Sequence, residues 1–130
     1  MKQIQQGDFY YVDSSLIKIE SFVGDAVNPV IDKEDVMGFI HIKDLKEIML
    51  TPILLKNIGF EKTNNNKYIL YSGKYVVEAY FNKTKEAFDV TIMIPTREER
   101  LTISVQEVNQ LKRLFEAFEI QAFWDALTSI

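Results

Sequence analysis

The chemistry of a metal or catalytic site in this chain would depend on one histidine. His41 is the only histidine and there is no cysteine, whereas zinc sites and catalytic triads combine several such groups. A predicted strand over 36–42 places His41 on the same face as Met37 and Phe39. We therefore predict a structural or surface histidine, and we assign no catalytic, metal-ligating or cofactor-binding residue.

The acidic residues do not have the spacing of a metal site or a catalytic pair either. The run 32–35 lacks the alternating oxygen ligands and central glycine of a calcium loop. Glu98 and Glu99 lie between Arg97 and Arg100, which is typical of an exposed, charge-balanced segment. The five glycines are scattered, so there is no phosphate-binding loop, and no serine has the setting of a nucleophile elbow. We expect a protein that is not an enzyme and has no cofactor.

One stretch combines basic and aromatic residues. Over 56–85 there are six lysines against two glutamates, with four interleaved tyrosines, and sheets that stack bases on aromatics beside lysines bind single strands. No arginine and no RNP-like motif occurs there, so core tyrosines with solvated lysines are favoured over nucleic-acid binding. If the stretch does bind nucleic acid, the candidate contact residues are Lys67, Lys74, Tyr80, Lys83 and Lys85.

A cluster of aromatic residues near the C-terminus is the candidate for a protein contact. If the last helix ends near Phe118, then Phe118, Phe123 and Trp124 can meet an unknown protein partner or a second copy of the chain. Closure of the core by these residues is favoured over a partner contact.

The N-terminal part of the chain is predicted to consist of short strands. Alternating or β-branched runs over 8–12, 16–23, 27–31 and 36–42 are separated by turn signals at 13–15, 24–25 and 32–35. This spacing predicts a small curled sheet or an SH3-like barrel.

The rest of the chain predicts a helix, a meander and a second helix. Thr51 and Pro52 start a two-turn helix that ends at Gly59 and packs through Ile53, Leu54 and Ile58. Strands follow over 67–71, 74–82, 88–94 and 101–105, with 96–100 as a charged loop and 64–66 as a turn. A capping box of Ser104 and Glu107 starts an amphipathic helix with an apolar stripe, and 119–130 extends it or forms a second short helix. The stripe consists of Val108, Leu111, Leu114, Phe115 and Phe118.

Composition is that of a globular domain. Of 130 residues, 47% are hydrophobic and 26% charged, the formal net charge is −4, and neither a secretory signal nor a membrane-length apolar window occurs. We expect one soluble, cytoplasmic domain over 1–130, with a subdivision into 1–50 and 51–130 as an alternative.

Two segments are similar to a known family. The segment 50–60, Leu50-Thr51-Pro52 to Gly59-Phe60, resembles the "LTP..L...GF" segment of small uncharacterised proteins of gut bacteria, their prophages and phages. The segment 108–115 resembles their "VHQLQNLY" helix, with Asn109 in place of the histidine, and the tail differs. The family has no assigned activity, so the resemblance implies a mobile-element context and carries no functional residues.

The fold class that we predict is α+β. It combines a β-rich N-terminal part, a short helix, and an antiparallel meander packed by a C-terminal amphipathic helix. The leading functional hypothesis is a non-enzymatic interaction module that binds protein through a sheet edge or the C-terminal aromatic face. Nucleic-acid binding is the alternative, and no membrane partner is expected.

Overall fold

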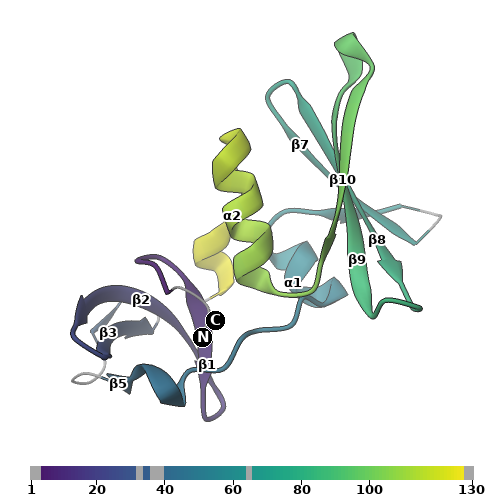
Figure 1. Ribbon diagram of the computed structural model, residues 1–130. Helices are drawn as coiled ribbons and strands as arrows, with labels where there is room; N and C mark the ends of the chain where they lie inside the picture. The colour runs from purple at the N-terminus through teal and green to yellow at the C-terminus, as the bar shows by residue number, and fades with distance from the viewer. Residues whose placement is uncertain (1–3, 32–33, 36–39, 64–65, 128–130) are drawn as a thin grey trace. The chain divides into compact units, whose positions relative to one another are not determined.

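A computed structural model of the chain describes residues 4–31, 34–35, 40–63 and 66–127. Within them, strands and helices form two compact units, Met1–Ile48 with Asp125–Ile130 (the N-terminal unit) and Met49–Trp124 (the central unit). Each unit contains an antiparallel sheet (Figure 1), so the predicted α+β class is confirmed.

The sheet of the N-terminal unit is built from short strands. Its strands are β1 (Phe9–Val12), β2 (Ser15–Val23), β3 (Ala26–Ile31), β4 (Glu34–Asp35) and β5 (Ile40–His41). They pair in the order β1-β2-β3-β4, and β5 also pairs with β3. The strands curl into a half-barrel, and Tyr11 and Lys46 exchange two backbone hydrogen bonds of 2.8 and 2.9 Å. This bridge ties β1 to the chain that follows the 3-10 helix Ile42–Asp44.

Alternation along β1 to β3 supplies the core of this unit. Tyr10, Ile17, Ile19 and Val27 are buried together, because successive strand residues point to opposite faces and these four share the inner one. Partly buried apolar side chains complete the cluster: Ile4, Val12, Ile40, Ile42 and Leu45. The predicted strands 8–12, 16–23 and 27–31 are confirmed within a residue or two.

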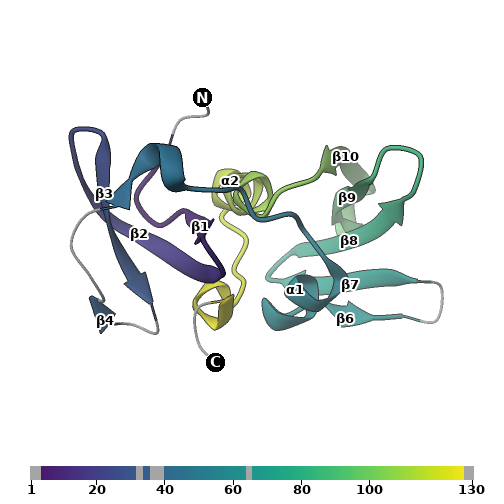
Figure 2. The same cartoon turned by 90° about the horizontal axis from the view of Figure 1, so that it is seen from below.

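The sheet of the central unit is a meander. Its strands are β6 (Glu61–Lys62), β7 (Lys67–Ser72), β8 (Tyr75–Asn82), β9 (Ala87–Ile94) and β10 (Glu99–Val105), in the order β10-β9-β8-β7-β6. Figure 2 shows β6 and β10 at opposite ends of this row. The inner face carries buried residues from the three central strands: Tyr68, Leu70, Val77, Ala79, Phe88, Val90 and Ile92.

The predicted two-turn helix is α1 (Pro52–Asn57). Thr51 Oγ1 accepts a hydrogen bond from the backbone N–H of Leu54 (3.2 Å), and Pro52 occupies the first turn. The expected packing of Ile53 was wrong: its side chain is 70% exposed, whereas Leu55 and Ile58 are buried. In a helix this short, a shift of one or two residues moves the buried stripe to another face.

The second helix is α2 (Val108–Phe118), and it begins later than the predicted start at Ser104. Ser104 belongs to β10, where its hydroxyl donates to Asp89 Oδ1 (3.0 Å). The capping box is formed by Glu107 and Gln110 instead, and Gln110 Oε1 accepts from the backbone N–H of Glu107 (3.0 Å). The predicted apolar stripe is confirmed at Val108, Leu111 and Phe115, which are buried.

Several predicted boundaries need correction. The strand 36–42 and the turns at 32–35 and 64–66 fall partly on residues outside the described ranges. Glu34 and Asp35 pair with β3 as a strand, and Glu99 and Arg100 belong to β10 and not to a loop. The tail does not extend α2, because Glu119 takes a positive φ of 57° and ends the helix. A 3-10 turn at Trp124–Leu127 follows.

Candidate functional site

The edge strand β10 is the most distinctive surface of the central unit. It starts after Glu98, whose left-handed φ of 54° ends the 3-10 turn Pro95–Arg97, and it pairs with β9 alone among the described strands. Leu101 lies opposite Ile92 and Ile103 opposite Val90. Because paired residues share a face, Leu101 and Ile103 are on the inner face that forms the core elsewhere.

These two residues, the aliphatic pair of β10, are not covered. Six consecutive residues of β10 are exposed, with Leu101 at 43% and Ile103 at 36%, whereas their neighbours Ile92 and Val90 are buried. The side of β10 that faces away from β9, the open edge, also carries backbone N–H and C=O groups without a strand partner among the described residues. Proteins usually protect such an edge with charge, a bulge or a covering element.

Polar side chains connect β10 to β9 on the outer face. Thr91 and Thr102 share a hydrogen bond between their hydroxyls (2.9 Å), and Ser104 donates to Asp89. A hydrogen bond from Asn82 Nδ2 (3.1 Å) is the main reason that the pKa of Asp89 is lowered. Desolvation opposes this shift, and Ser104 and the Lys85 ammonium, 3.8 Å away, reinforce it. An anionic carboxylate therefore lies on the outer face, one strand in from the open edge.

A small groove lies between Leu101, one member of the aliphatic pair, and the end of α2 at Phe118. It has a volume of about 140 Å³, and Leu101, Ile92, Tyr75 and Phe118 are among its lining residues. The rings of Tyr75 and Phe118 meet edge to face, with centroids 5.8 Å apart. Such a groove can accept an apolar side chain from an added strand.

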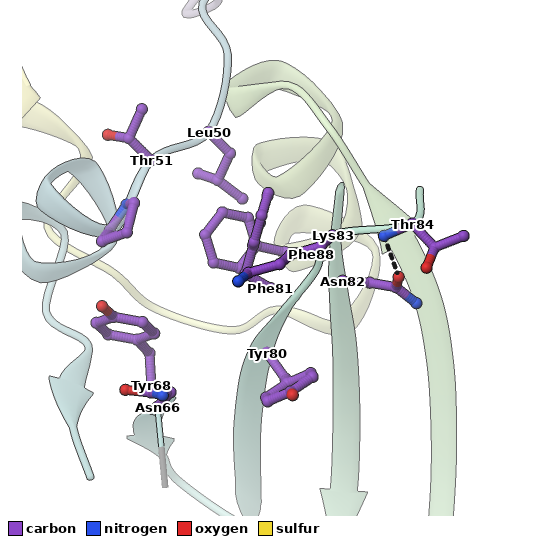
Figure 3. A pocket seen from close by; sticks show the side chains of 11 residues that line it. Leu50, Thr51, Asn66, Tyr68, Tyr80, Phe81, Asn82, Lys83, Thr84 and Phe88 are labelled. Carbon is purple, nitrogen blue, oxygen red and sulfur yellow. Dashed lines mark hydrogen bonds between the residues drawn. The ribbon is translucent and has the colours of Figure 1, made fainter. Parts of the chain in front are cut away.

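A larger pocket lies between the start of α1 and the turn that joins β8 to β9 (Figure 3). It measures about 840 Å³, and its apolar lining is Leu50, Pro52, Tyr68, Phe81 and Phe88. Its polar lining is Thr51, Asn66, Tyr80, Asn82, Lys83 and Thr84. Figure 3 shows Asn82 accepting a hydrogen bond from the backbone N–H of Thr84 (3.1 Å), which holds one wall in place. The lining of this pocket suits an apolar or aromatic group better than a strongly charged one.

The predicted C-terminal aromatic contact divides into three environments. Phe118 lies at the groove beside Tyr75, and Trp124 is half-buried against Phe115 with ring centroids 5.6 Å apart. Phe123 is 70% exposed although its backbone N–H donates to Ile58 O (2.9 Å). Each of the three residues thus has different surroundings, and their role as a partner contact stays a prediction.

The candidate nucleic-acid residues are distributed unevenly. Lys67 lies directly opposite Tyr80, which is 48% exposed, and Lys83 and Lys85 are in the turn that follows β8. Lys74 lies in the turn at the other end of β8, and its ammonium is 5.3 Å from the ring centroid of Tyr75. The structure thus brings four of the five residues to one end of the sheet.

The remaining sequence candidates have local structural roles. His41 is exposed, and its Nδ1 accepts a hydrogen bond from the backbone N–H of Lys43 (3.1 Å) at the start of the 3-10 helix. The residues that the structure describes contain no group of three or more histidine, cysteine or acidic residues able to hold a metal ion. Among these residues, no helix combines the length and the apolar character that spanning a membrane requires.

The sequence indicated the strand at 101–105 but not its exposure. A period-two pattern of Leu101, Ile103 and Val105 predicts which face they share, and it does not report whether a helix covers that face. The helix α2 packs over the inner face at Tyr75, whereas the aliphatic pair stays partly exposed to solvent.

Comparisons of the chain with protein-family models, with curated proteins and with solved structures gave no match. The resemblance to the proteins of gut bacteria and their phages therefore stays a prediction. The geometry of the chain's own surfaces is what bears on its function.

Proposed function

We propose that this chain is a non-enzymatic protein–protein interaction module, and that the open edge of β10 is its binding surface. The observation that supports this most directly is the run of six exposed residues in β10, which includes two aliphatic side chains on the core face. A partner strand added at this edge would satisfy the backbone groups and bury the aliphatic pair together.

The chemistry of the edge defines the kind of segment that fits. An extended segment pairs its backbone with β10, and its alternate side chains point to opposite faces. Those on the inner face should be aliphatic, to match Leu101 and Ile103 and to reach the groove beside Phe118. Those on the outer face meet Arg100, Thr102 and Ser104, so they should be polar.

The experiment is a capture test in the native host. Cells that express the tagged chain are cross-linked, and co-purifying proteins are compared between wild type, the double variant Leu101→Lys/Ile103→Lys, and Ile53→Lys. Ile53 is a matched control, because it is also an exposed aliphatic residue but lies on α1. The proposal expects the double variant to lose partners that wild type and Ile53→Lys retain. Identical partners in all three samples contradict it.

A second candidate function is binding of single-stranded nucleic acid. It is favoured by the pairing of exposed Tyr80 with Lys67, next to a pocket lined in part by Lys83 and Phe81, because a base can stack on an aromatic ring beside a lysine. Fluorescence anisotropy with a labelled oligonucleotide at low salt tests it. Affinity that weakens with salt and is lost in Tyr80→Ala supports this function, and no binding at low salt eliminates it.

A further inference from the structure

We infer that the segment that pairs with the open edge is β10 of a second copy of this chain. The two β10 strands run antiparallel about a two-fold axis through Thr102, so that the sheets of two central units become continuous. This inference rests on the proposed interaction function, and it names the partner.

The aliphatic pair is complementary to itself in this register. With Thr102 opposite Thr102 of the second copy, Leu101 of each copy lies opposite Ile103 of the other. A two-fold axis perpendicular to the sheet keeps the inner faces on one side, so four aliphatic side chains that are 36–43% exposed in the single chain meet in one row. Aliphatic cross-strand pairs of this kind stabilise antiparallel sheets.

The polar side chains of the outer face also match. Arg100 of one copy lies opposite Ser104 of the other, and that Ser104 is hydrogen-bonded to the ionised Asp89. Each guanidinium is thereby on the same outer face as the anionic carboxylate of the other copy, one strand beyond Ser104, and this arrangement of opposite charges occurs twice by symmetry. The hydroxyl pair Thr91–Thr102, 2.9 Å apart, continues across the axis as a row of four threonines.

The length of β10 and the position of Glu99 favour a pair centred on Thr102 over pairs centred on Leu101 or Ile103. The paired stretch Glu99–Val105 is symmetric about Thr102, so each Glu99 stays at the end of the aliphatic row. A pair centred on Ile103 would need Glu107 opposite Glu99, but Glu107 lies outside β10 at the start of α2, so only Leu101–Val105 could pair. A pair centred on Leu101 places Glu99 opposite Ile103, so that each isoleucine faces a carboxylate and Val105 has no β10 residue opposite it.

The absence of cysteine in the sequence makes the register measurable. Directly opposite residues of an antiparallel pair have Cα atoms about 4.5–5.5 Å apart, which lies within the range of roughly 4.4–6.8 Å that a disulfide spans. Thr102→Cys should therefore oxidise to a covalent dimer. Thr91→Cys is the matched control, since it removes the same hydroxyl hydrogen bond but lies one strand further in. Its two thiols would be separated by about three strand spacings, roughly 14 Å.

The test measures disulfide formation under mild oxidation, together with sedimentation of the reduced wild-type chain. The expected result is a concentration-dependent dimer for wild type and cross-linking of Thr102→Cys at least tenfold faster than of Thr91→Cys. An equimolar mixture of Leu101→Cys and Ile103→Cys should cross-link faster than either variant alone. Circular dichroism confirms that each variant is folded.

Equal cross-linking rates for Thr102→Cys and Thr91→Cys, or a wild-type chain that sediments as a monomer at every concentration, overturn the self-pairing. The proposed interaction function is judged separately, by the capture experiment with Leu101→Lys/Ile103→Lys. If that variant loses a different protein while Thr102→Cys fails to cross-link, then the edge binds another partner and the inference is wrong. If self-pairing is observed, the edge function and its occupant are both supported.

Discussion

Replacing the aliphatic pair with lysines should abolish self-association while leaving the chain folded. In Leu101→Lys/Ile103→Lys the two residues that meet across the proposed axis become cations. The lysine introduced at position 101 of each copy then lies opposite the lysine introduced at position 103 of the other, and like charges in directly opposite positions destabilise a strand pair. Inward-pointing charges are also one of the ways in which natural edge strands avoid pairing.

The magnitude follows from the exposure of the two side chains. Full burial of a leucine or isoleucine contributes about 1.5–3 kcal/mol, and association can bury only the exposed parts, which are 43% for Leu101 and 36% for Ile103. For the four side chains of a symmetric pair, this gives about 2–5 kcal/mol. At about 1.4 kcal/mol per factor of ten, the dimerisation constant should fall by roughly 30- to 4,000-fold, before any repulsion between the lysines is counted.

Sedimentation equilibrium over a range of concentrations measures this change. Ile53→Lys is the control, because it adds the same kind of charge at another exposed aliphatic position and should keep the wild-type dimerisation constant. Thermal unfolding followed by circular dichroism checks that both variants are folded. A double variant whose dimerisation constant stays within threefold of wild type would refute the reasoning, because the aliphatic row would then contribute nothing to the association.

Three further predictions concern the central unit. Gly59→Ala should lower the free energy of unfolding by about 1–3 kcal/mol in a urea titration. Gly59 has a φ of +118°, and an added Cβ would lie 3.1 Å from Phe123 Cδ2. An unchanged urea midpoint would contradict this. Glu107→Ala should cost about 1 kcal/mol in thermal unfolding through loss of the capping box with Gln110, and no loss would show that the cap is not needed. The pKa of Asp89 is lower in the folded chain than in the unfolded one, so its ionisation stabilises the fold above the unfolded pKa, and this contribution is lost as the pH falls through the folded pKa. The urea midpoints of wild type and Asp89→Asn should therefore differ near neutral pH and converge in acid, and a gap that does not depend on pH would disprove the assignment.

The sequence predicted the elements that are set by local signals. Thr51 and Pro52 identify the start of α1, and Gly59 its end, because a side-chain cap, a missing N–H and a positive φ are local requirements. The alternation of Phe88, Val90 and Ile92 predicts the buried face of β9 for the same reason.

The errors arise where two local patterns compete or where tertiary contacts decide. Ser104 and Glu107 have the spacing of a capping box, but Ser104 is also in register with Asp89 and hydrogen-bonds to it across the sheet, so the helix starts later. Ile53 follows the pattern of a buried helix residue yet faces solvent. Burial of a face depends on which element covers it, and a single sequence has no local signal for that choice.

The same limit applies to the candidate site. Leu101 and Ile103 have the pattern of ordinary core residues of a strand, and only the paired position of β10 at the end of the sheet, beyond the cover of α2, exposes them. Conversely, Phe118 and Trp124 were candidates for a partner contact, and the structure places each against another ring, Tyr75 and Phe115.

The most direct test of the open edge is amide hydrogen exchange of β10, measured by NMR on the wild-type chain in dilute and in concentrated solution. Alternate residues of an edge strand direct their N–H groups away from the neighbouring strand, so one half of the β10 amides should exchange quickly in dilute solution. We predict that these amides become protected as the concentration rises, while the amides of β9 stay protected throughout. Full protection of every β10 amide in dilute solution, or fast exchange of the alternate set at all concentrations, would contradict it.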